Sequence, residues 1–532
     1  MTRILYSLRK NGLLISSLLI FSLSTHAADY VVKVKNSFNM ESFQTQVEQI
    51  PDIKILNQHE LGNLYLIHVE DSVQESYVEE KLKQIDAFEY MVPNIKFHIN
   101  VPNDPHIASQ WALKKVGASK AWELSSGKIR PIVAVIDTGV DYKHEDLASQ
   151  ILKDDKGAVK GWNYIEDNND PMDITMAGKN PGHGTHCAGI IGAAQNGIGV
   201  SGIVPNVYIM PLRFIGPDGS GDLMNSIKAI DFAIQNGAQI ISASWGAAVQ
   251  RSMVKPLLEA IERAGQKGII FVAAAANDGK SNDTREVYPA NAGFSNVISV
   301  AASDKNDAKP TWSNYGRSKV DLASPGAAIL STLPGNKYGE LSGTSMATPL
   351  VAGTVALLLA QSLQEGKQLN GPELKALLQA NSQKVEIETA CNCRISAELS
   401  MNAVLENKLT VVPNAGTFAI GQEVKFHAIG GHGPYKFTSS NPNALSITES
   451  GELKAVTAGS SNIQVTDADG NSAYSHAVFA ADASKQPEPP GGGGGNGQCP
   501  FPNPQLCEIL CKMMPKAPWC KQVSVTDVFN LQ

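Results

Sequence analysis

Short, almost uninterrupted hydrophobic runs alternate with amphipathic helices between residues 101 and 405, and this alternation limits the fold more than any other feature. The runs include PIVAVIDTG, VYIMPLRFI, QIISASWG, GIIFVAAAAND and NVISVAASD, and the helices include LMNSIKAIDFAIQNG and PLLEAIERAGQKG. Strands that are apolar on both faces belong in a parallel sheet covered by helices. We therefore predict an α/β domain with a parallel sheet flanked by helices. In such sheets, functional groups gather beyond the carboxyl ends of the strands.

The chain of 532 residues is too long for one hydrophobic core, and changes in its sequence pattern mark further domains. Residues 28–100 combine two helical stretches with alternating strands in a β-α-β-β-α-β order, which predicts a small α+β domain. Residues 408–482 carry short alternating strands with Gly, Pro and Asn turns, which predict a small β-sandwich. Residues 483–498 have the composition of a flexible linker. A cysteine-rich module at 499–532 follows the linker.

Residues 1–27 have the pattern of a secretory signal peptide, with a basic start, a short apolar run and a small-residue exit ending at Ala27. The run LLISSLLIFSLS is short for a membrane span, and we expect no span after signal removal. A retained N-terminal anchor is the alternative. We expect a secreted protein in the medium, the periplasm or at the cell surface. A net charge of −7 argues against nucleic acid as a partner.

If the protein is secreted, its seven cysteines lie in an oxidising compartment, where disulfides form. Four of them lie in the last module, namely Cys499, Cys507, Cys511 and Cys520. We expect two disulfides among these four, in one of three pairings. Cys391 and Cys393 either pair with each other or stay separate. Zinc is disfavoured in both places because no histidines interleave with the cysteines.

Polar side chains stand where predicted strands end. PIVAVIDTG leads into Asp137, and GIIFVAAAAND leads into Asn277. A buried carboxylate needs hydrogen-bond donors, and an imidazole is a suitable one. GHGTHCAGIIGAA offers His183 and His186 at the start of a helix of very small residues, which packs tightly and fixes what stands there. For a lone strand-end Asp, a turn or a helix cap is the simpler explanation.

Hydroxyl groups crowd the start of a buried helix in ELSGTSMATPLVAGTVALLLA, residues 340–360. Ser342, Thr344 and Ser345 lie there, and Pro349 follows within the first turns, where proline is tolerated. Helix capping is the simpler explanation. The alternative is that one serine is held at the helix start as a nucleophile, which requires a base and an acid elsewhere. Acid, imidazole, hydroxyl and amide together are the groups of acyl transfer.

Four motifs, VIDTGVD, GHGTHCAG, AAAND and GTSMATP, resemble those of the subtilisin-like serine peptidases, in that family's Asp–His–Ser order. The resemblance covers about residues 101–400. It implies a serine endopeptidase with the triad Asp137, His183 and Ser345, and an oxyanion site made by the Asn277 side chain and the Ser345 backbone N–H. It makes His186 a packed neighbour of the base. Residues 28–100 resemble the family's propeptide, which inhibits the enzyme and assists its folding.

The same resemblance implies a cleft in which substrate lies as an added strand between two extended segments. These segments are Gly219-Ser220-Gly221 and Ser244-Trp245-Gly246. Backbone pairing of this kind accepts any extended peptide, so we expect protein substrates and broad specificity. Ala276 and Val287 stand where the family usually has glycines at the primary pocket, and their bulk favours a medium apolar side chain over a large aromatic one. We expect a monomer.

A structural calcium ion is the cofactor that the resemblance implies. This hard cation binds oxygen ligands. The matching positions are Asp104, Asp146, Asn196 and the carbonyl groups of Ala194, Ile198 and Val200. An acidic surface turn without an ion is the alternative. The acidic run EDNNDPMD, residues 166–173, is a candidate for a second ion, without assignable ligands.

Cys187 follows His186 directly, as in the thiol-containing branch of the family that includes proteinase K and thermitase. We expect a small buried residue there, because Ser345 already supplies the nucleophile. Zinc held by His183, His186 and Cys187 is disfavoured, since it would take the base from the serine. The competing hypothesis for the whole chain is a binding protein with an inactive peptidase fold. It is disfavoured because inactive relatives usually lose a triad residue, and none is missing.

Self-processing is expected from a propeptide-like segment that precedes an intact triad. The junction must be extended, and the prolines around it disfavour a helix. The propeptide sheet needs the strand IKFHI, and the calcium site needs Asp104, so we expect the cut within Phe97–Pro102. Asn100 or Val101 is the expected residue before the cut bond. Trimming of an exposed linker by another peptidase is the alternative.

Overall fold

The computed structural model describes residues 28–35, 40–59, 63–70, 73, 75–94, 104–125 and 127–482. The chain divides into two compact units, Met1–Ile99 and Asn100–Gln532. The expected signal peptide, the expected cut within Phe97–Pro102, the linker at 483–498 and the four C-terminal cysteines lie outside the described residues.

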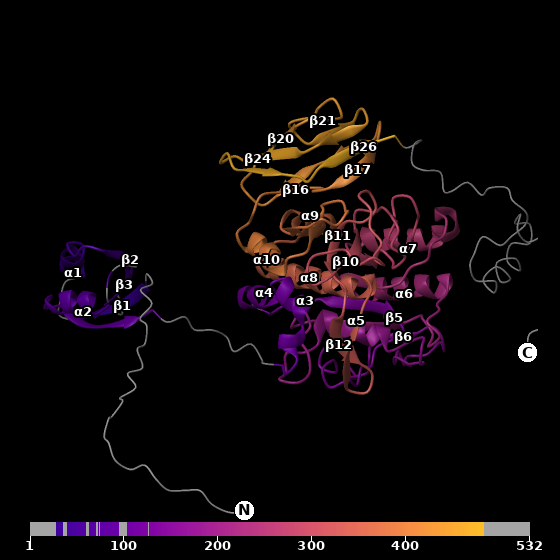
Figure 1. The fold of residues 1–532 in the computed structure, drawn as a ribbon, viewed down its shortest axis with the longest axis horizontal. Coiled ribbons are helices and arrows are strands. Elements are labelled where there is room, and N and C mark those ends of the chain that lie inside the picture. Colours follow the sequence, from indigo (N-terminus) through magenta and orange to yellow (C-terminus); the bar gives the residue numbers. More distant parts are fainter. Residues whose placement is uncertain are drawn as a thin grey trace, which may run out of the picture. The chain divides into compact units, whose positions relative to one another are not determined.

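The N-terminal unit contains one antiparallel sheet with the strand order β2-β3-β1-β4, together with two helices (Figure 1). Its elements are β1 (Ala28–Val34), α1 (Met40–Val47), β2 (Ile53–His59), β3 (Leu64–Val69), α2 (Glu75–Lys83) and β4 (Phe88–Pro93). Alternate strand residues such as Val32 and Tyr65 are buried with Phe43 of α1 and Leu82 of α2. The β-α-β-β-α-β order is the one predicted from the sequence, but the strand that completes the sheet is Phe88–Pro93, earlier in the chain than the expected IKFHI.

The second unit is built on a nine-stranded sheet with the order β14-β15-β11-β10-β9-β8-β5-β7-β6. Adjacent strands pair in parallel, except that β14 and β15 are antiparallel. The strands are β5 (Ile132–Asp137), β6 (Trp162–Asn163), β7 (Tyr208–Arg213), β8 (Ile240–Ala243), β9 (Ile270–Ala274), β10 (Val297–Ser303), β11 (Leu322–Pro325), β14 (Gln383–Lys384) and β15 (Cys393–Arg394). A separate hairpin joins β12 (Ile329–Leu333) to β13 (Lys337–Leu341). The predicted parallel sheet is confirmed.

Helices cover both faces of this sheet, as Figure 1 shows. The helices are α3 (Trp111–Lys115), α4 (Ala118–Leu124), α5 (His183–Gly192), α6 (Leu223–Gln235), α7 (Lys255–Gln266), α8 (Thr344–Gln364), α9 (Gly371–Ala380) and α10 (Ala397–Leu405), with short 3₁₀ turns η2 (Ile107–Ser109) and η3 (Arg251–Val254). Along β5, Val133 and Val135 share a core with α5 and α8, whereas Ala134 and Ile136 share a core with α6 and α7. The period-two alternation of a strand therefore separates two helical layers.

Helix α8 lies at the centre of the second unit and is apolar nearly all round. It is the one described helix that is long and apolar enough to cross a membrane, and 94% of its most apolar window is buried inside the protein. Gly353 lets its neighbours approach closely, because a Cβ built there would lie 2.2 Å from Ile203 Cγ2 and 3.2 Å from the Ile191 carbonyl oxygen. Burial of this kind identifies α8 as the core helix of the unit.

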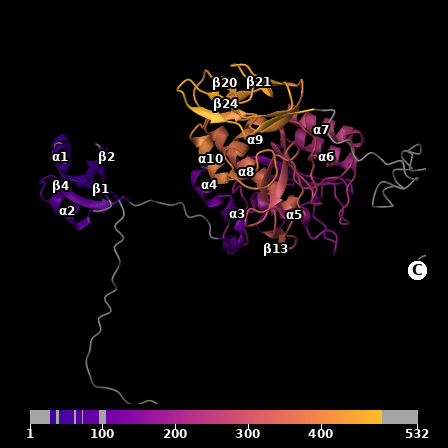
Figure 2. The same ribbon diagram turned by 45° about the horizontal axis from the view of Figure 1, so that its top comes forward.

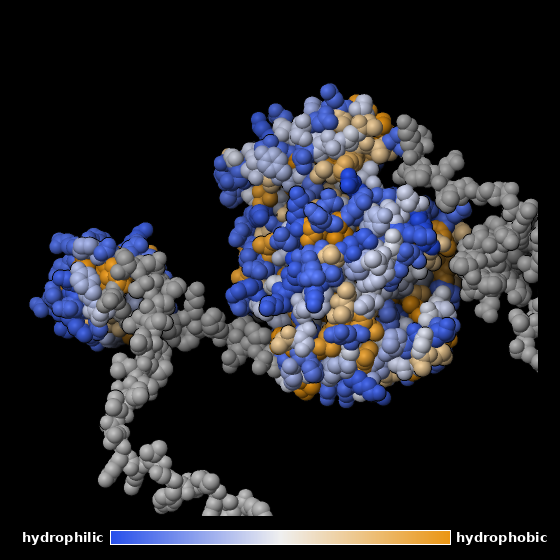
Figure 3. Space-filling view, in the orientation of Figure 1, coloured by the Kyte–Doolittle hydropathy of each residue, from blue (hydrophilic) through white to orange (hydrophobic). Residues whose placement is uncertain are grey.

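Residues 408–482, which we call the C-terminal β region, contain four small sheets around one core. The strands are β16 (Thr410–Val412), β17 (Gly416–Ala419), β18 (Glu423–Lys425), β19 (His427–Ile429), β20 (Lys436–Ser439), β21 (Leu445–Ile447), β22 (Glu452–Ala455), β23 (Gly459–Ser461), β24 (Ile463–Thr466), β25 (Ser472–Tyr474) and β26 (Val478–Ala481). Phe426, Phe437 and Val465 lie in its core. On the face shown in Figure 3, hydrophobic residues of this region gather near β17 and β26.

The C-terminal β region packs against α9 through β16 (Figure 2). His476 Nε2 lies 2.9 Å from the Gln379 carbonyl oxygen. His427 Nε2 lies 3.2 Å from Glu373 Oε1. Polar contacts from α9 thus hold this region on the parallel-sheet fold.

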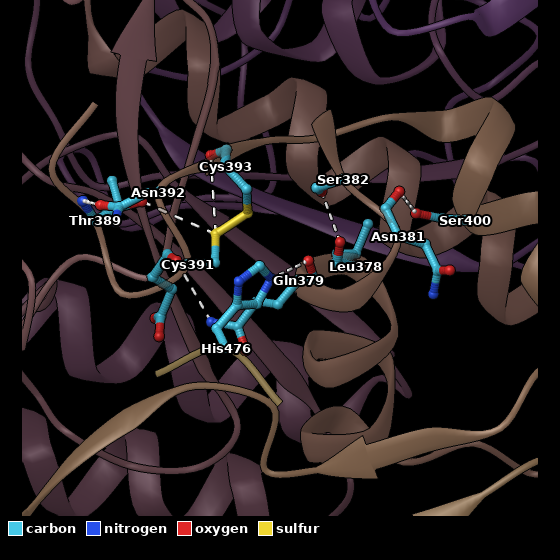
Figure 4. Close-up of a disulfide and its surroundings, with 11 residues drawn as sticks. Leu378, Gln379, Asn381, Ser382, Thr389, Cys391, Asn392, Cys393, Ser400 and His476 are labelled. Carbon is cyan, nitrogen blue, oxygen red and sulfur yellow. Dashed lines mark hydrogen bonds between the residues drawn. A yellow bond between two sulfur atoms is a disulfide. The ribbon is translucent and has the colours of Figure 1, made fainter. Parts of the chain in front are cut away.

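The sulfur atoms of Cys391 and Cys393 are bonded to each other in the structure, which is one of the two arrangements left open by the sequence. Both residues are buried. Figure 4 shows the bond close to Gln379 and His476, at the place where the C-terminal β region meets α9. The disulfide therefore lies beside this contact.

Candidate active site

Asp137 is the last residue of β5, and His183 is the first residue of α5. His183 Nδ1 lies 2.7 Å from Asp137 Oδ1. Burial is the largest single effect and lowers the pKa of His183, but the charge and hydrogen bond of the Asp137 carboxylate, together with Cys187, outweigh it, so that this pKa lies well above its ordinary value. Because a carboxylate only accepts hydrogen bonds, Nδ1 carries the proton, and Nε2 is left to receive another one.

Side chains from the preceding loop close the start of α5. Asn180 Oδ1 accepts hydrogen bonds from the backbone N–H groups of Gly182 and His183, both at 2.9 Å. Asp173 Oδ2 accepts from the Thr185 N–H at 3.0 Å and from its hydroxyl at 2.8 Å. Asn180 Nδ2 donates to Asp173 Oδ1 at 2.8 Å, and both side chains are buried. This hydrogen-bonded pair positions the residue that carries the imidazole.

Sequence reasoning missed both of these capping residues. A capping-type Asn shortly before a predicted helix was a signal for Asn180. Asp173 lies ten positions before His183, outside the spacing of any local capping pattern.

Ser345 is the second residue of α8, and the start of this helix is open. Its Oγ donates to the Ser244 carbonyl oxygen at 3.0 Å, and Ser244 Oγ donates to the Ser345 carbonyl oxygen at 2.9 Å. Gly343 at the N-cap provides no side-chain cap. Within the part of the chain that the structure describes, the Ser345 backbone N–H donates no hydrogen bond. A helix start with an unbonded backbone N–H group favours a negatively charged group beside it.

Asn277 follows β9, and its side-chain N–H groups, which donate no hydrogen bond among the described residues, lie at the same place. Its Oδ1 accepts hydrogen bonds from the Thr344 backbone N–H at 2.8 Å and from the Thr344 hydroxyl at 3.0 Å. The amide orientation is thereby fixed. A Cβ built at Gly343 would lie 3.4 Å from Asn277 Nδ2 and 3.5 Å from the Ser345 backbone nitrogen. Two donor nitrogens therefore lie close to one point at the start of α8, an arrangement that suits an oxyanion site.

His186 and Cys187 are buried behind His183. His186 Nε2 lies 3.0 Å from the Gly339 carbonyl oxygen, and burial lowers the pKa of His186 to about 4. Burial also raises the pKa of the Cys187 thiol. Ligand atoms of Asp137, His183 and Cys187 lie within 4.8 Å of one another. A protonated thiol and an imidazole engaged by Asp137 are poor zinc ligands, so this group fits an acid–base pair better than a metal site.

A cleft passes His183, Asn277 and Ser345. Of the predicted substrate-contacting residues, those that line it are Gly219, Ser244, Trp245, Gly246, Ala276 and Val287. Ser220 and Gly221 are next to this lining without being part of it, and the Ser220 hydroxyl donates to Asp218 Oδ2 at 2.6 Å. Val287 is buried beneath Gly246, where a Cβ would meet Val287 Cγ1 at 3.3 Å. Both predicted pocket residues thus face the cleft that holds the serine.

The residues predicted to bind calcium also lie together. Asp104 Oδ1 accepts from the Gly197 N–H at 2.8 Å, and Asp146 Oδ2 accepts from the Val200 N–H at 2.9 Å. Asn196 Oδ1 accepts from the Ile198 N–H at 3.0 Å, which turns the loop back on itself. The Ala194 N–H donates to the Asp146 carbonyl oxygen at 2.8 Å.

The surroundings of Asp146 favour a bound cation. Its Oδ1 is buried and has no hydrogen-bond partner among the described residues. Burial chiefly raises its pKa to about 6, and the nearby Asp104 carboxylate adds to this effect, while the Val200 N–H and the side chains of Asn196 and Tyr338 oppose it. Two buried carboxylates and an unpartnered oxygen fit a hard cation.

Together, a parallel α/β sheet, an Asp–His pair and a serine at an open helix start define the class of serine peptidases. The sequence model of the subtilase family matches residues 129–403. Thermitase from Thermoactinomyces vulgaris is 41% identical over 262 residues, which are 49% of this chain and 86% of thermitase. The chain therefore belongs to the subtilase family and is a serine endopeptidase.

Two further relatives agree with this assignment. A thermophilic serine proteinase from Bacillus sp. (strain AK1) is 35% identical over 311 residues, which are 58% of this chain and 71% of the relative. A solved protease structure from Pseudoalteromonas arctica has a TM-score of 0.50 and 26% identity, covering 57% of this chain and 100% of that one. Proteins are accordingly its substrates.

Proposed function

We propose that this protein is a secreted, self-processing and calcium-stabilised subtilase that hydrolyses proteins with broad specificity through Asp137, His183 and Ser345. The observation that supports this most directly is the 2.7 Å contact between His183 Nδ1 and Asp137 Oδ1, in a cleft that His183 shares with Ser345. Acid, base and hydroxyl are the three groups that acyl transfer through a serine requires.

In this proposal, Ser345 Oγ attacks the peptide carbonyl carbon while His183 Nε2 takes the hydroxyl proton. The same nitrogen then gives that proton to the amine that leaves, and it activates the water that hydrolyses the acyl-enzyme. Asp137 stabilises the imidazolium form of His183. The negative oxygen of the tetrahedral intermediate accepts hydrogen bonds from the Ser345 N–H and from Asn277 Nδ2. Both nitrogens lie close to one point at the start of α8.

The test is hydrolysis of casein by the purified mature protein, with and without a serine-directed sulfonyl fluoride. We expect hydrolysis to stop when the reagent is added, and Ser345 to carry the reagent in peptide mass spectra. A binding protein with an inactive peptidase fold would give no hydrolysis before treatment and no modified serine, and this result would overturn the proposal.

The pocket residues support a preference for a medium apolar side chain before the cut bond. Ala276 and Val287 both line the cleft, and each occupies space near the serine. A panel of peptides that differ only in the residue before the cut bond measures this preference. Faster cleavage after Phe or Tyr than after Leu would contradict it.

Calcium is proposed as a structural ion held by Asp104, Asp146, Asn196 and the carbonyl groups of Ala194, Ile198 and Val200. When bound, the ion would satisfy the buried Asp146 Oδ1 and offset the repulsion between the two carboxylates. An ion that binds only the folded state raises the thermal midpoint by mass action. We expect a chelator to lower this midpoint, and Asp104→Ala and Asp146→Ala to remove most of that response. Equal midpoints in chelator and in excess calcium would exclude the ion.

Secretion and self-processing are proposed from residues 1–27 and from the propeptide-like unit at 28–100. The proposed cut lies within Phe97–Pro102. N-terminal sequencing of the extracellular mature protein tests both proposals at once. A start within residues 28–90, or beyond Asp104, would contradict the proposed junction.

A further inference from the structure

A short hairpin loop forms part of the cleft wall beside His183. Residues 174–179 are exposed, and they lie between the buried side chains of Asp173 and Asn180. Met176 and Asn180 exchange backbone hydrogen bonds of 2.8 and 2.9 Å, and the Lys179 N–H donates to the Met176 carbonyl oxygen at 3.0 Å. The Asp173–Asn180 side-chain bond that caps α5 also closes the base of this loop. The position of Lys179 is therefore tied to that of His183.

Lys179 lines the cleft together with Gly219, and the two come close across it. A Cβ built at Gly219 would lie 3.9 Å from the Lys179 carbonyl oxygen. Gly219 belongs to one of the two extended segments expected to pair with the substrate strand. A substrate strand that lies along this segment therefore passes the Lys179 loop.

Among the described residues, the Lys179 ammonium group has no close ion-pair partner, although the Asp218 carboxylate lies near enough to interact with it. The other charged residues that line the cleft, apart from His183, are Asp278 and Arg285, and these pair with each other at 2.9 Å. Lys179 has no ion-pair partner within 4.0 Å among the described residues. Nearby Asp218 is engaged by Ser220, whose hydroxyl lowers the pKa of Asp218 most, with a smaller contribution from Lys179.

We infer that Lys179 selects substrates with Asp or Glu among the residues that precede the cut bond. The inference rests on the proposed function, which makes the cleft beside Ser345 the place where a substrate chain binds. An ammonium group on the wall attracts a substrate carboxylate and repels a substrate Lys or Arg. Because alternate residues of an extended chain point the same way, the preference falls on one or two positions and leaves the others tolerant.

The test uses matched peptides that carry Asp, Asn or Lys at the second, third or fourth position before the cut bond. At one position, we expect the wild-type kcat/KM to favour Asp over Asn by about two- to fivefold, the range of exposed ion pairs. Lys179→Gln should bring this ratio to about one, and Lys179→Glu should reverse it in favour of Lys. The wild-type ratio should shrink when the ionic strength rises from about 0.05 to about 0.5 M.

Lys267→Gln is the matched control, because Lys267 is an exposed residue at the end of α7 that does not line the cleft. It should keep the wild-type ratio. Equal rates for Asp and Asn peptides at all three positions, or a ratio that Lys179→Glu does not change, would overturn the inference. Either result with active enzyme leaves the proposed peptidase function standing, whereas failure to cleave the Asn peptides at all counts against that function.

Discussion

Helices α5 and α8 carry the proposed base and the proposed nucleophile, and they begin in opposite ways. At α5, the first N–H groups are taken by buried side chains, since Asn180 binds at His183 and Asp173 binds at Thr185. At α8, the Ser345 N–H has no acceptor within the described residues. Any helix leaves its first N–H groups without partners inside the helix. We call the start of α5 the closed start and the start of α8 the open start. The closed start fixes an imidazole in place, and the open start keeps its N–H donors for a substrate.

Asn277 shows how the open start is kept in order. Its oxygen accepts both hydrogen bonds from Thr344, so the first N–H of α8 is satisfied while the next one stays free. The same amide then presents its nitrogen beside the Ser345 N–H. The hydrogen bonds between Asn277 and Thr344 thus hold two unbonded N–H donors in fixed positions, which is what electrostatic preorganisation requires.

The largest effect should come from removing the hydroxyl at the open start. Ser345→Ala should lower kcat by about 10⁶-fold, the size found for the corresponding change in subtilisin, because the attacking atom is lost. The precursor should also stay unprocessed. Casein hydrolysis and the mass of the secreted chain measure these two outcomes. A processed chain with residual casein cleavage well above that level would show that another group attacks.

Removing one oxyanion donor should have the next largest effect. Asn277→Ala should reduce kcat by about 10²–10³-fold, the magnitude known for the equivalent donor in subtilisin. Asn277→Asp is the sharper variant, because it keeps an oxygen for Thr344 and loses the N–H. Asn306→Ala, at an exposed position outside the cleft, is the control. A near wild-type kcat for Asn277→Asp would mean that a different donor serves the oxyanion.

The pH profile tests the base at the closed start. His183 must be neutral to accept a proton, and Asp137 holds its pKa well above the ordinary value. Activity should therefore fall as the pH drops through that raised pKa, by about tenfold per unit below it. In Asp137→Asn, the residual activity should fall at a lower pH. A wild-type midpoint below that of an ordinary imidazole would contradict the role of the carboxylate.

The smallest effect should come from opening the closed start. Asn180→Ala should lower the free energy of unfolding by about 0.5–2 kcal/mol, as for other lost helix caps, and kcat/KM by severalfold because the imidazole is less well held. Thermal unfolding and peptide kinetics measure the two changes. Asn370→Ala removes the cap of α9, away from the cleft, and should lower stability by a similar amount with full activity. Equal kinetics in both variants would show that the closed start serves stability alone.

The open start could be predicted from the amino-acid sequence in more detail than the closed one. Apolar runs fix where strands end, so the sequence alone places Asp137 and Asn277 at the edge of a parallel sheet. Family resemblance then assigned them roles. Asp173 had no such signal, since it reaches Thr185 only after the 174–179 loop folds back. Capping patterns describe short fixed spacings, and a side chain that reaches Thr185 from the far side of the 174–179 loop lies outside them.

The orientation of the Ser345 hydroxyl also could not be predicted from the sequence. It donates to the carbonyl oxygen of Ser244, a residue that the sequence placed only in the substrate-contacting segment. Which acceptor a hydroxyl uses depends on the rotamer and on packing across the sheet. Local sequence patterns describe neither of these.

The distance along the chain between Asp137 and Ser345 also determines when catalysis can begin. The aspartate ends β5, the first strand of the parallel sheet in chain order, and the serine is the second residue of α8, which follows β13. Contacts between such distant segments form late and slowly during folding. During synthesis, the chain acquires its proposed acid and its proposed base long before its proposed nucleophile. If Ser345 is the nucleophile, a nascent chain shorter than 345 residues is inert toward its neighbours, whatever its degree of folding.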